Sequence, residues 1–268
     1  MAFQITKVSD VGTGNPIVAR MLPGLQDIIK MAQIGEAKQK AITKACYEIK
    51  TALVQAEKAA KPLMNEIKLI EQNLATDGVK TQNNGRIIET PGVLNLDNTK
   101  IFLKFGKQAL QYLAVAMGQI LDEDFKGPHF HKVLDRARKL FGADAAVTKL
   151  LEVDQAWIKD LIELRSEDEH PKSEKAFVTG FDIQVATSPG QYIVRPPRFF
   201  NETDLLSRLE SFSHNLLTFS EELIAHSLAH FFPSMVVIYE IPEEQRDVAM
   251  PVRFRLGLKK DVHIPGAT

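Results

Sequence analysis

Apolar residues recur at steps of three and four along most of the chain, and this spacing is typical of amphipathic helices. The most regular run extends from residue 42 to residue 74, with charged residues such as Lys50 and Glu57 off its apolar seam. The seam consists of Ile42, Cys46, Ile49, Leu53, Ala56, Ala60, Leu63, Ile67, Ile70 and Leu74. Pro62 lies inside the run and predicts a kink, or two helices that meet near Lys61. The run favours a bundle helix within the chain, with an intermolecular coiled coil as the alternative.

Other segments share this helical spacing. A short helix over residues 17–33 is expected to be interrupted at Pro23 and Gly24. Longer helices are predicted over residues 96–121, 131–141, 144–165 and 201–230. Gly142 is the natural residue to end the second of these. Asn201 is the expected N-cap of the last, with Asp204 as its capping-box partner.

Strand-like alternation appears mainly after Pro171. A hairpin insertion is predicted over about 177–198, with its turn at Ser188-Pro189-Gly190, and two further strands over about 234–258. A shorter hairpin is predicted over residues 79–90, around Asn84-Gly85. The chain is therefore predicted to be mainly α, a helical bundle with a small antiparallel β-element near the C-terminus, in a single domain over residues 1–268.

Composition narrows the class of protein. The chain has 268 residues, of which 44% are hydrophobic and 25% charged, with a net charge of −1. These values are ordinary for a soluble globular protein and argue against a wholly basic surface. The single cysteine, Cys46, excludes an internal disulfide and fits a reducing compartment. No apolar run approaches the roughly 20 residues of a membrane-spanning helix, so a cytoplasmic protein without a membrane partner is expected.

Charge is concentrated where the predicted 144–165 helix ends. Arg165 follows an apolar stripe, and a guanidinium there complements the negative pole of the helix. Pro171 prevents the helix from continuing and pushes His170 toward an extended conformation. Three acidic residues, Glu167, Asp168 and Glu169, lie between the arginine and the histidine. The sequence thus places a guanidinium and an imidazole close together at a helix terminus.

Arg165 and His170, with four residues between them, resemble the R-x4–6-H motif of the HEPN superfamily. The members are helical-bundle proteins, and many are RNases of toxin–antitoxin and phage-defence systems; the resemblance covers about residues 143–231. It implies a metal-independent RNase without a cofactor, in which His170 exchanges the proton of a ribose 2′-hydroxyl and Arg165 stabilises the phosphorane. In the family two such motifs usually meet across a homodimer, so RNA and a second copy are the implied partners.

A structural interpretation of the same residues stands beside this one. Arg165 then pairs with a neighbouring carboxylate or with Asp160, and the charged cluster only ends the helix. The protein would be a non-catalytic interaction protein that binds a protein partner through its seam helix or through a basic strand face.

Two further sets of residues are weaker candidates. His226 and His230 share a helix face with Glu222 one turn earlier, as metal ligands would, with His129 or His131 as further ligands. The alternative is a pair of histidines on an apolar helix seam. Nucleic-acid binding is the function suggested by four arginines in or beside the predicted strands, Arg253, Arg255, Arg195 and Arg198. The alternative for them is the solvated side of a two-layer element.

Overall fold

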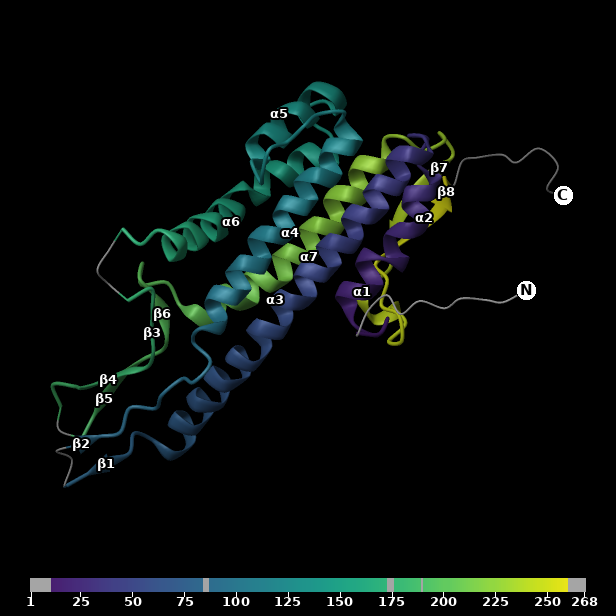
Figure 1. Ribbon diagram of the computed structural model, residues 1–268. Helices are drawn as coiled ribbons and strands as arrows, with labels where there is room; N and C mark the ends of the chain where they lie inside the picture. The colour runs from purple at the N-terminus through teal and green to yellow at the C-terminus, as the bar shows by residue number, and fades with distance from the viewer. Residues whose placement is uncertain (1–10, 84–86, 173–175, 189, 260–268) are drawn as a thin grey trace, which may run out of the picture. The chain divides into compact units, whose positions relative to one another are not determined.

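The computed structural model describes residues 11–83, 87–172, 176–188 and 190–259. These residues form a mainly α-helical protein with short antiparallel strands, most of them toward the C-terminus, as the sequence predicts (Figure 1). The helices are α1 (Pro16–Met21), α2 (Pro23–Met31), α3 (Glu36–Asp77), α4 (Asn98–Leu121), α5 (Phe130–Phe141), α6 (Ala146–Glu169), α7 (Leu205–Ala229) and the short 3-10 helix η1 (Glu243–Gln245). The strands are β1 (Thr81–Gln82), β2 (Ile87–Ile88), β3 (Val178–Thr179), β4 (Asp182–Val185), β5 (Tyr192–Arg195), β6 (Arg198–Phe199), β7 (Val236–Glu240) and β8 (Phe254–Leu258).

The helix boundaries follow local chemistry. The side chain of Asn15 accepts a hydrogen bond of 2.8 Å from the backbone N–H of Ile17 and caps α1. A proline starts α2, and this break between α1 and α2 confirms the predicted interruption. Gly142 ends α5 with φ 91°, a conformation that residues with a side chain rarely adopt.

The predicted N-cap of α7 was wrong by three residues. Asp204, and not Asn201, is the N-cap, because its Oδ1 accepts a hydrogen bond of 2.7 Å from the backbone N–H of Ser207. Asn201 instead accepts hydrogen bonds from the backbone and side chain of Thr203 in the preceding turn. Both residues have the side-chain chemistry of a cap, so the sequence alone does not separate them.

The described residues fall into two compact units, each built from several segments of the chain. The first comprises residues up to 53, 108–155 and 217 onward; the second comprises residues 54–107 and 156–216. The long helices α3, α4, α6 and α7 each contribute one segment to each unit.

In the first unit, α1, α2 and α5 pack with segments of the long helices. Phe130 of α5 meets Phe219 of α7 edge to face, with ring centroids 5.4 Å apart, inside a core of mostly aliphatic side chains. Cys46 is buried in this core, and burial raises the pKa of its thiol to about 12. Strands β7 and β8 pair antiparallel and confirm the C-terminal strands.

In the second unit, α4 comes very close to α6 and α7. A Cβ atom added at Gly106 would lie 3.2 Å from Leu216 and 3.3 Å from Leu161. The strands form antiparallel pairs β1–β2, β3–β6 and β4–β5, which confirms both predicted hairpins. The turn residues 84–86 and Pro189 lie outside the described residues. The strands β1, β2, β4 and β5 lie beyond the C-terminal end of α3 (Figure 1).

The apolar seam of α3 packs inside the chain. Its residues from Ile42 to Leu53 are buried in the first unit, and those from Ala56 to Ile67 in the second. The helix runs unbroken through Pro62, so of the two alternatives expected there, a kinked helix or two helices meeting near Lys61, the structure excludes the second. Across the described residues, no helix is both long and apolar enough to cross a membrane.

Candidate functional sites

Arg165 lies one turn before the C-terminal end of α6 and makes ion pairs with residues of its own helix. Its side chain is 16% exposed and contacts the carboxylates of Asp168 and Glu169, the latter through Nη2 and Oε1 at 3.0 Å. Lys107 of α4 donates a hydrogen bond of 2.9 Å to the other oxygen of Glu169. This hydrogen bond and the charge of Arg165 lower the pKa of Glu169. The guanidinium therefore faces two carboxylates of its own helix.

His170 follows the helix directly and is exposed. The arginine and histidine of the motif are thus both at the helix terminus, as predicted, although α6 extends to Glu169 and not only to Arg165. Asp160 pairs with Arg208 at 2.9 Å and is not the partner of Arg165. The ion pairs of Arg165 with its neighbouring carboxylates are those that the structural interpretation predicts.

His226 of α7 and His230, which directly follows this helix, make aromatic contacts. The ring of His230 stacks on Phe141, with centroids 4.1 Å apart, and the ring of His226 meets Phe254 edge to face. Glu222 binds Arg253 through Oε1 at 2.5 Å. Burial lowers the pKa of both histidines. In the part of the chain that the structure describes, no group of three or more His, Cys, Asp or Glu side chains is arranged to hold a metal ion.

The four arginines of the predicted basic face differ in their surroundings. Arg253 and Arg255 belong to the first unit, and Arg195 and Arg198 to the second. Arg198 pairs with Glu202 at 2.6 Å. Arg195 and Arg255 are exposed. An ion-paired arginine attracts a phosphate more weakly than a free one, so the predicted face is less basic than its sequence indicates.

Arg253 is the most strongly paired of the four. Its Nε donates to Glu240 at 2.7 Å and its Nη2 lies 2.5 Å from Glu222. These hydrogen bonds and charges raise the pKa of Arg253 against the opposing effect of burial, and the hydrogen bond from Arg253 lowers the pKa of Glu240. Glu222 of α7 and Glu240 of β7 thereby hold Arg253, which directly precedes β8.

A buried ion pair lies next to this arginine. Glu221 of α7 is fully buried and accepts a hydrogen bond of 2.6 Å from Nε of Arg20 in α1. Arg253 Nη1 is 4.0 Å from the same oxygen. Burial raises the pKa of Glu221, and the two arginines only partly oppose that rise. This ion pair was not predicted from the sequence, in which its only signal is an arginine inside the apolar run Ile17–Met21.

A pocket of about 550 Å³, called here the charged pocket, adjoins Arg253 in the first unit. Its walls come from the first turns of α6, from α7, from β7 and from the start of β8. The lining residues are Ala146, Lys149, Leu150, Val153, Glu222, His226, Ile238, Glu240, Arg253 and Phe254. It therefore combines charged groups of both signs with an apolar wall.

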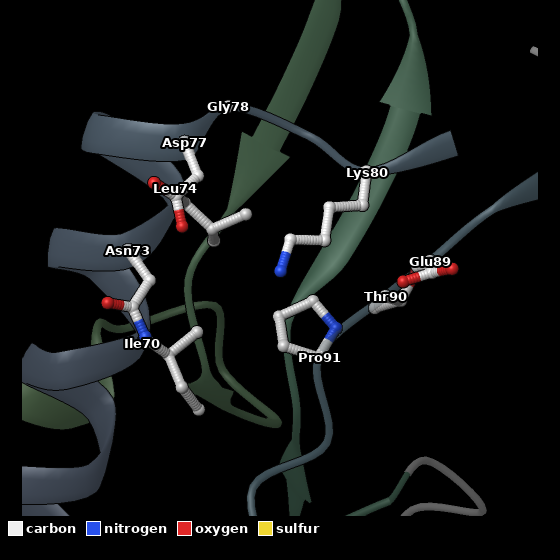
Figure 2. Close-up of a pocket in the computed structure, with 9 residues that line it drawn as sticks. All are labelled: Ile70, Asn73, Leu74, Asp77, Gly78, Lys80, Glu89, Thr90 and Pro91. Atoms are coloured by element: carbon white, nitrogen blue, oxygen red, sulfur yellow. The ribbon is translucent and has the colours of Figure 1, made fainter. Parts of the chain in front are cut away.

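A smaller hollow of about 290 Å³ lies in the second unit, where α3 ends. Figure 2 shows the side chain of Lys80 reaching across the opening, with Pro91 below it and Ile70 and Leu74 of α3 opposite. Strands of the same unit pass behind it in the view. The α3-end hollow therefore combines the aliphatic side chains of Ile70 and Leu74 with polar and charged ones, which include Asp77, Lys80 and Glu89.

The β4–β5 hairpin exposes apolar side chains close by in the same unit. Val185 is 62% exposed, Ile193 48% and Val194 38%. In the antiparallel register Ile183 is opposite Val194, and Val185 is opposite Tyr192, so these four side chains share one face of the ribbon. Ile183 is buried, whereas the face opens to solvent toward the turn.

The fold and these sites define the chain as a mainly helical protein with paired short strands and two compact units. A comparison with family models found no match, and comparisons with curated proteins and with solved structures found none either.

Proposed function

We propose that this chain is a non-catalytic interaction protein that binds a protein partner on the strand-bearing part of its second unit. The observation that carries the proposal is the apolar face of the β4–β5 hairpin, which stays exposed at Val185 and Val194. Exposed apolar faces of this kind mark sites of protein association. Each fully buried aliphatic side chain contributes about 1.5–3 kcal/mol.

The backbone of the hairpin supports the same role. Within the described residues, β4 and β5 pair only with each other, so the outer edge of each strand has no ladder partner. An extended segment of a partner adds to such an edge through main-chain hydrogen bonds, and alternate side chains then contact the apolar face. The α3-end hollow provides an anchor for one partner side chain, because central pockets of this type receive the residues that dominate binding.

The surfaces first considered for a partner are less suitable. The seam of α3 is buried as far as Ile67, and Arg253 of the basic strand is surrounded by carboxylates. The hairpin, by contrast, leaves Val185 and Val194 exposed on one face.

The test compares Val185→Asp and Val194→Asp with Val248→Asp, whose parent residue is 89% exposed in the first unit. Light scattering measures whether a second copy is the partner, and quantitative cross-linking in the producing cells identifies a different one. We expect wild type and Val248→Asp to form a dimer or to cross-link to a partner. The two hairpin variants should lose this association. A monomer with the same cross-links in all four proteins would overturn the proposal.

A HEPN-like, metal-independent RNase is the second candidate, favoured by the exposure of His170 at the end of the helix that carries Arg165. For cleavage, the guanidinium of Arg165 must release the carboxylate of Asp168 or Glu169 and bind the phosphate of the RNA instead. Purified protein is incubated with several RNAs in EDTA, together with Arg165→Ala and His170→Ala; His214→Ala, an exposed histidine of α7, is the control. Cleavage lost only in the first two variants supports the enzyme, and uncut RNA with wild type excludes it.

A further inference from the structure

The charged pocket of the first unit has a balanced set of charges. Two carboxylates, Glu222 and Glu240, and two cations, Arg253 and Lys149, line it. Glu222 and Arg253 are largely buried, with side chains 18% and 15% exposed. A ligand with charge of only one sign would meet repulsion from half of this set. An uncharged apolar ligand would remove the charged groups from water without compensating them.

Polar atoms remain available in spite of the internal ion pairs. Both carboxylates contact Arg253 through Oε1, and within the described residues Oε2 of neither makes a hydrogen bond. Nη1 of Arg253 is 4.0 Å from Glu221, which is too long for a hydrogen bond. The pocket therefore holds acceptors for an ammonium group and donors for a carboxylate close together. The ammonium of Lys149 lies at its rim, where it pairs with the exposed carboxylate of Asp144 at 3.1 Å.

His226 adds polarity without adding charge. Burial is the largest effect on its pKa and lowers it, so the imidazole is neutral near pH 7. The charge balance set by the other four side chains is thus kept. A neutral imidazole also donates through one nitrogen and accepts through the other, which suits a polar ligand of either type.

The remaining wall is apolar. Leu150 and Val153 of α6 face it together with Ile238 and Phe254. Val153 is 78% exposed, an unusual position for a branched aliphatic residue beside a pocket. The volume of about 550 Å³ is within the range of sites for small molecules.

We propose that the charged pocket binds a free α-amino acid with an apolar side chain. The ammonium group is received by Glu222 and Glu240, the carboxylate by Arg253 and Lys149, and the side chain lies against Leu150 and Val153. This binding site is in the first unit and is independent of the partner surface proposed for the second.

Calorimetry with the full chain tests the proposal through a series of probes. Leucine and phenylalanine are compared with 4-methylpentanoate, which lacks the amine, leucinamide, which lacks the carboxylate, and glycine, which lacks the side chain. We expect saturable binding of leucine, phenylalanine or both, and at least about tenfold weaker binding of the three truncated probes. Failure of both amino acids to bind at about 10 mM, or binding of any truncated probe as tight as that of leucine, overturns the proposal.

Variants then place the binding in this pocket. Val153→Asp introduces charge on the apolar wall, and Lys149→Ala removes the cation at the rim; both parent residues are exposed, so folding is preserved. Leu140→Asp, in which an exposed residue of α5 is changed in the same way, is the control. We expect about tenfold weaker leucine binding in the first two variants and none of this loss in the control. Equal affinity in all four proteins contradicts the assignment.

Discussion

Glu221 is the residue at which burial and charge conflict most strongly. Its carboxyl group is fully buried. Arg20 and Arg253 approach Oε2, whereas Oε1 accepts no hydrogen bond from the described residues. Ion pairs of this kind compensate the desolvation of a carboxylate only in part. The pKa of Glu221 is raised accordingly.

This raised pKa makes the stability of the protein depend on pH. Above the ordinary value of 4.5, the folded state keeps the Glu221 proton that the unfolded chain has already released. The folded state then binds more protons, so the contribution of Glu221 to the free energy of unfolding falls as pH rises through this window. It is fully present below pH 4.5 and lost once pH exceeds the raised pKa.

The prediction is tested by urea unfolding of wild type and Glu221→Gln over a series of pH values. The free energy of unfolding of wild type minus that of the variant should decrease as pH rises from below 4.5. Glu163→Gln, at an exposed position of α6, is the control for loss of a carboxylate outside the core. A difference for Glu221→Gln that does not change with pH would contradict the prediction.

At the scale of the element, Gly142 determines where α5 ends. Its φ of 91° and ψ of 163° lie in a region that residues with a side chain rarely enter. Gly142→Ala should therefore lower the free energy of unfolding by about 1–3 kcal/mol, although nothing lies within 4 Å of the added methyl group.

The matched control is Gly12→Ala, which also has open space around the added methyl group but no positive φ. Chemical denaturation should show no loss of stability for Gly12→Ala. Equal losses for the two variants would mean that backbone conformation at Gly142 is not the cause.

The start of α7 offers a second comparison between neighbouring residues. Asp204→Ala removes the side chain that caps the helix and should cost about 1 kcal/mol. Asn201→Ala removes only hydrogen bonds within the preceding turn and should cost less. The two free energies of unfolding are measured under the same conditions, and a larger loss for Asn201→Ala would restore the boundary predicted from the sequence.

For the whole molecule, the continuity of the long helices bears on how it unfolds. Each of α3, α4, α6 and α7 passes from one unit into the other without a break. Helix formation is cooperative, so melting one unit alone would require four helices to end in their interiors. We therefore expect the two units to unfold together.

The single tryptophan makes this expectation measurable. Trp157 belongs to the second unit, so its fluorescence reports on that unit, whereas far-ultraviolet circular dichroism reports on the helices of both. The two signals should have the same denaturation midpoint. In Phe219→Ala, which is altered in the core of the first unit, both midpoints should fall together by an amount corresponding to about 3–5 kcal/mol. Separate midpoints would show that the units unfold independently.

Much of the fold was predictable from local patterns. The seam of α3, the break between α1 and α2, the glycine that ends α5 and the hairpins all follow from neighbours within a few residues. Two features could not be predicted in this way. At Pro62 the sequence allowed one kinked helix or two helices, and at the start of α7 both Asn201 and Asp204 could cap the helix. In each case the packing of the fold selects between two arrangements that are locally acceptable.

The candidate sites were less predictable for the same reason. The sequence placed Arg165 and His170 at one helix terminus, but only the folded structure shows that Asp168 and Glu169 take the guanidinium. The sequence singled out Glu222, His226 and Arg253, but not their assembly into the charged pocket, because its walls come from α6, α7 and the β7–β8 hairpin and its residues span positions 146–254.

The amino-acid sequence by itself determined that this is a mainly helical protein with short antiparallel strands, because hydrophobic periodicity and turn residues act over short distances. The tertiary structure alone decided which charges are paired and which apolar side chains stay exposed. Those outcomes depend on contacts between residues remote in the chain, such as Arg20 with Glu221 and Arg253 with Glu222.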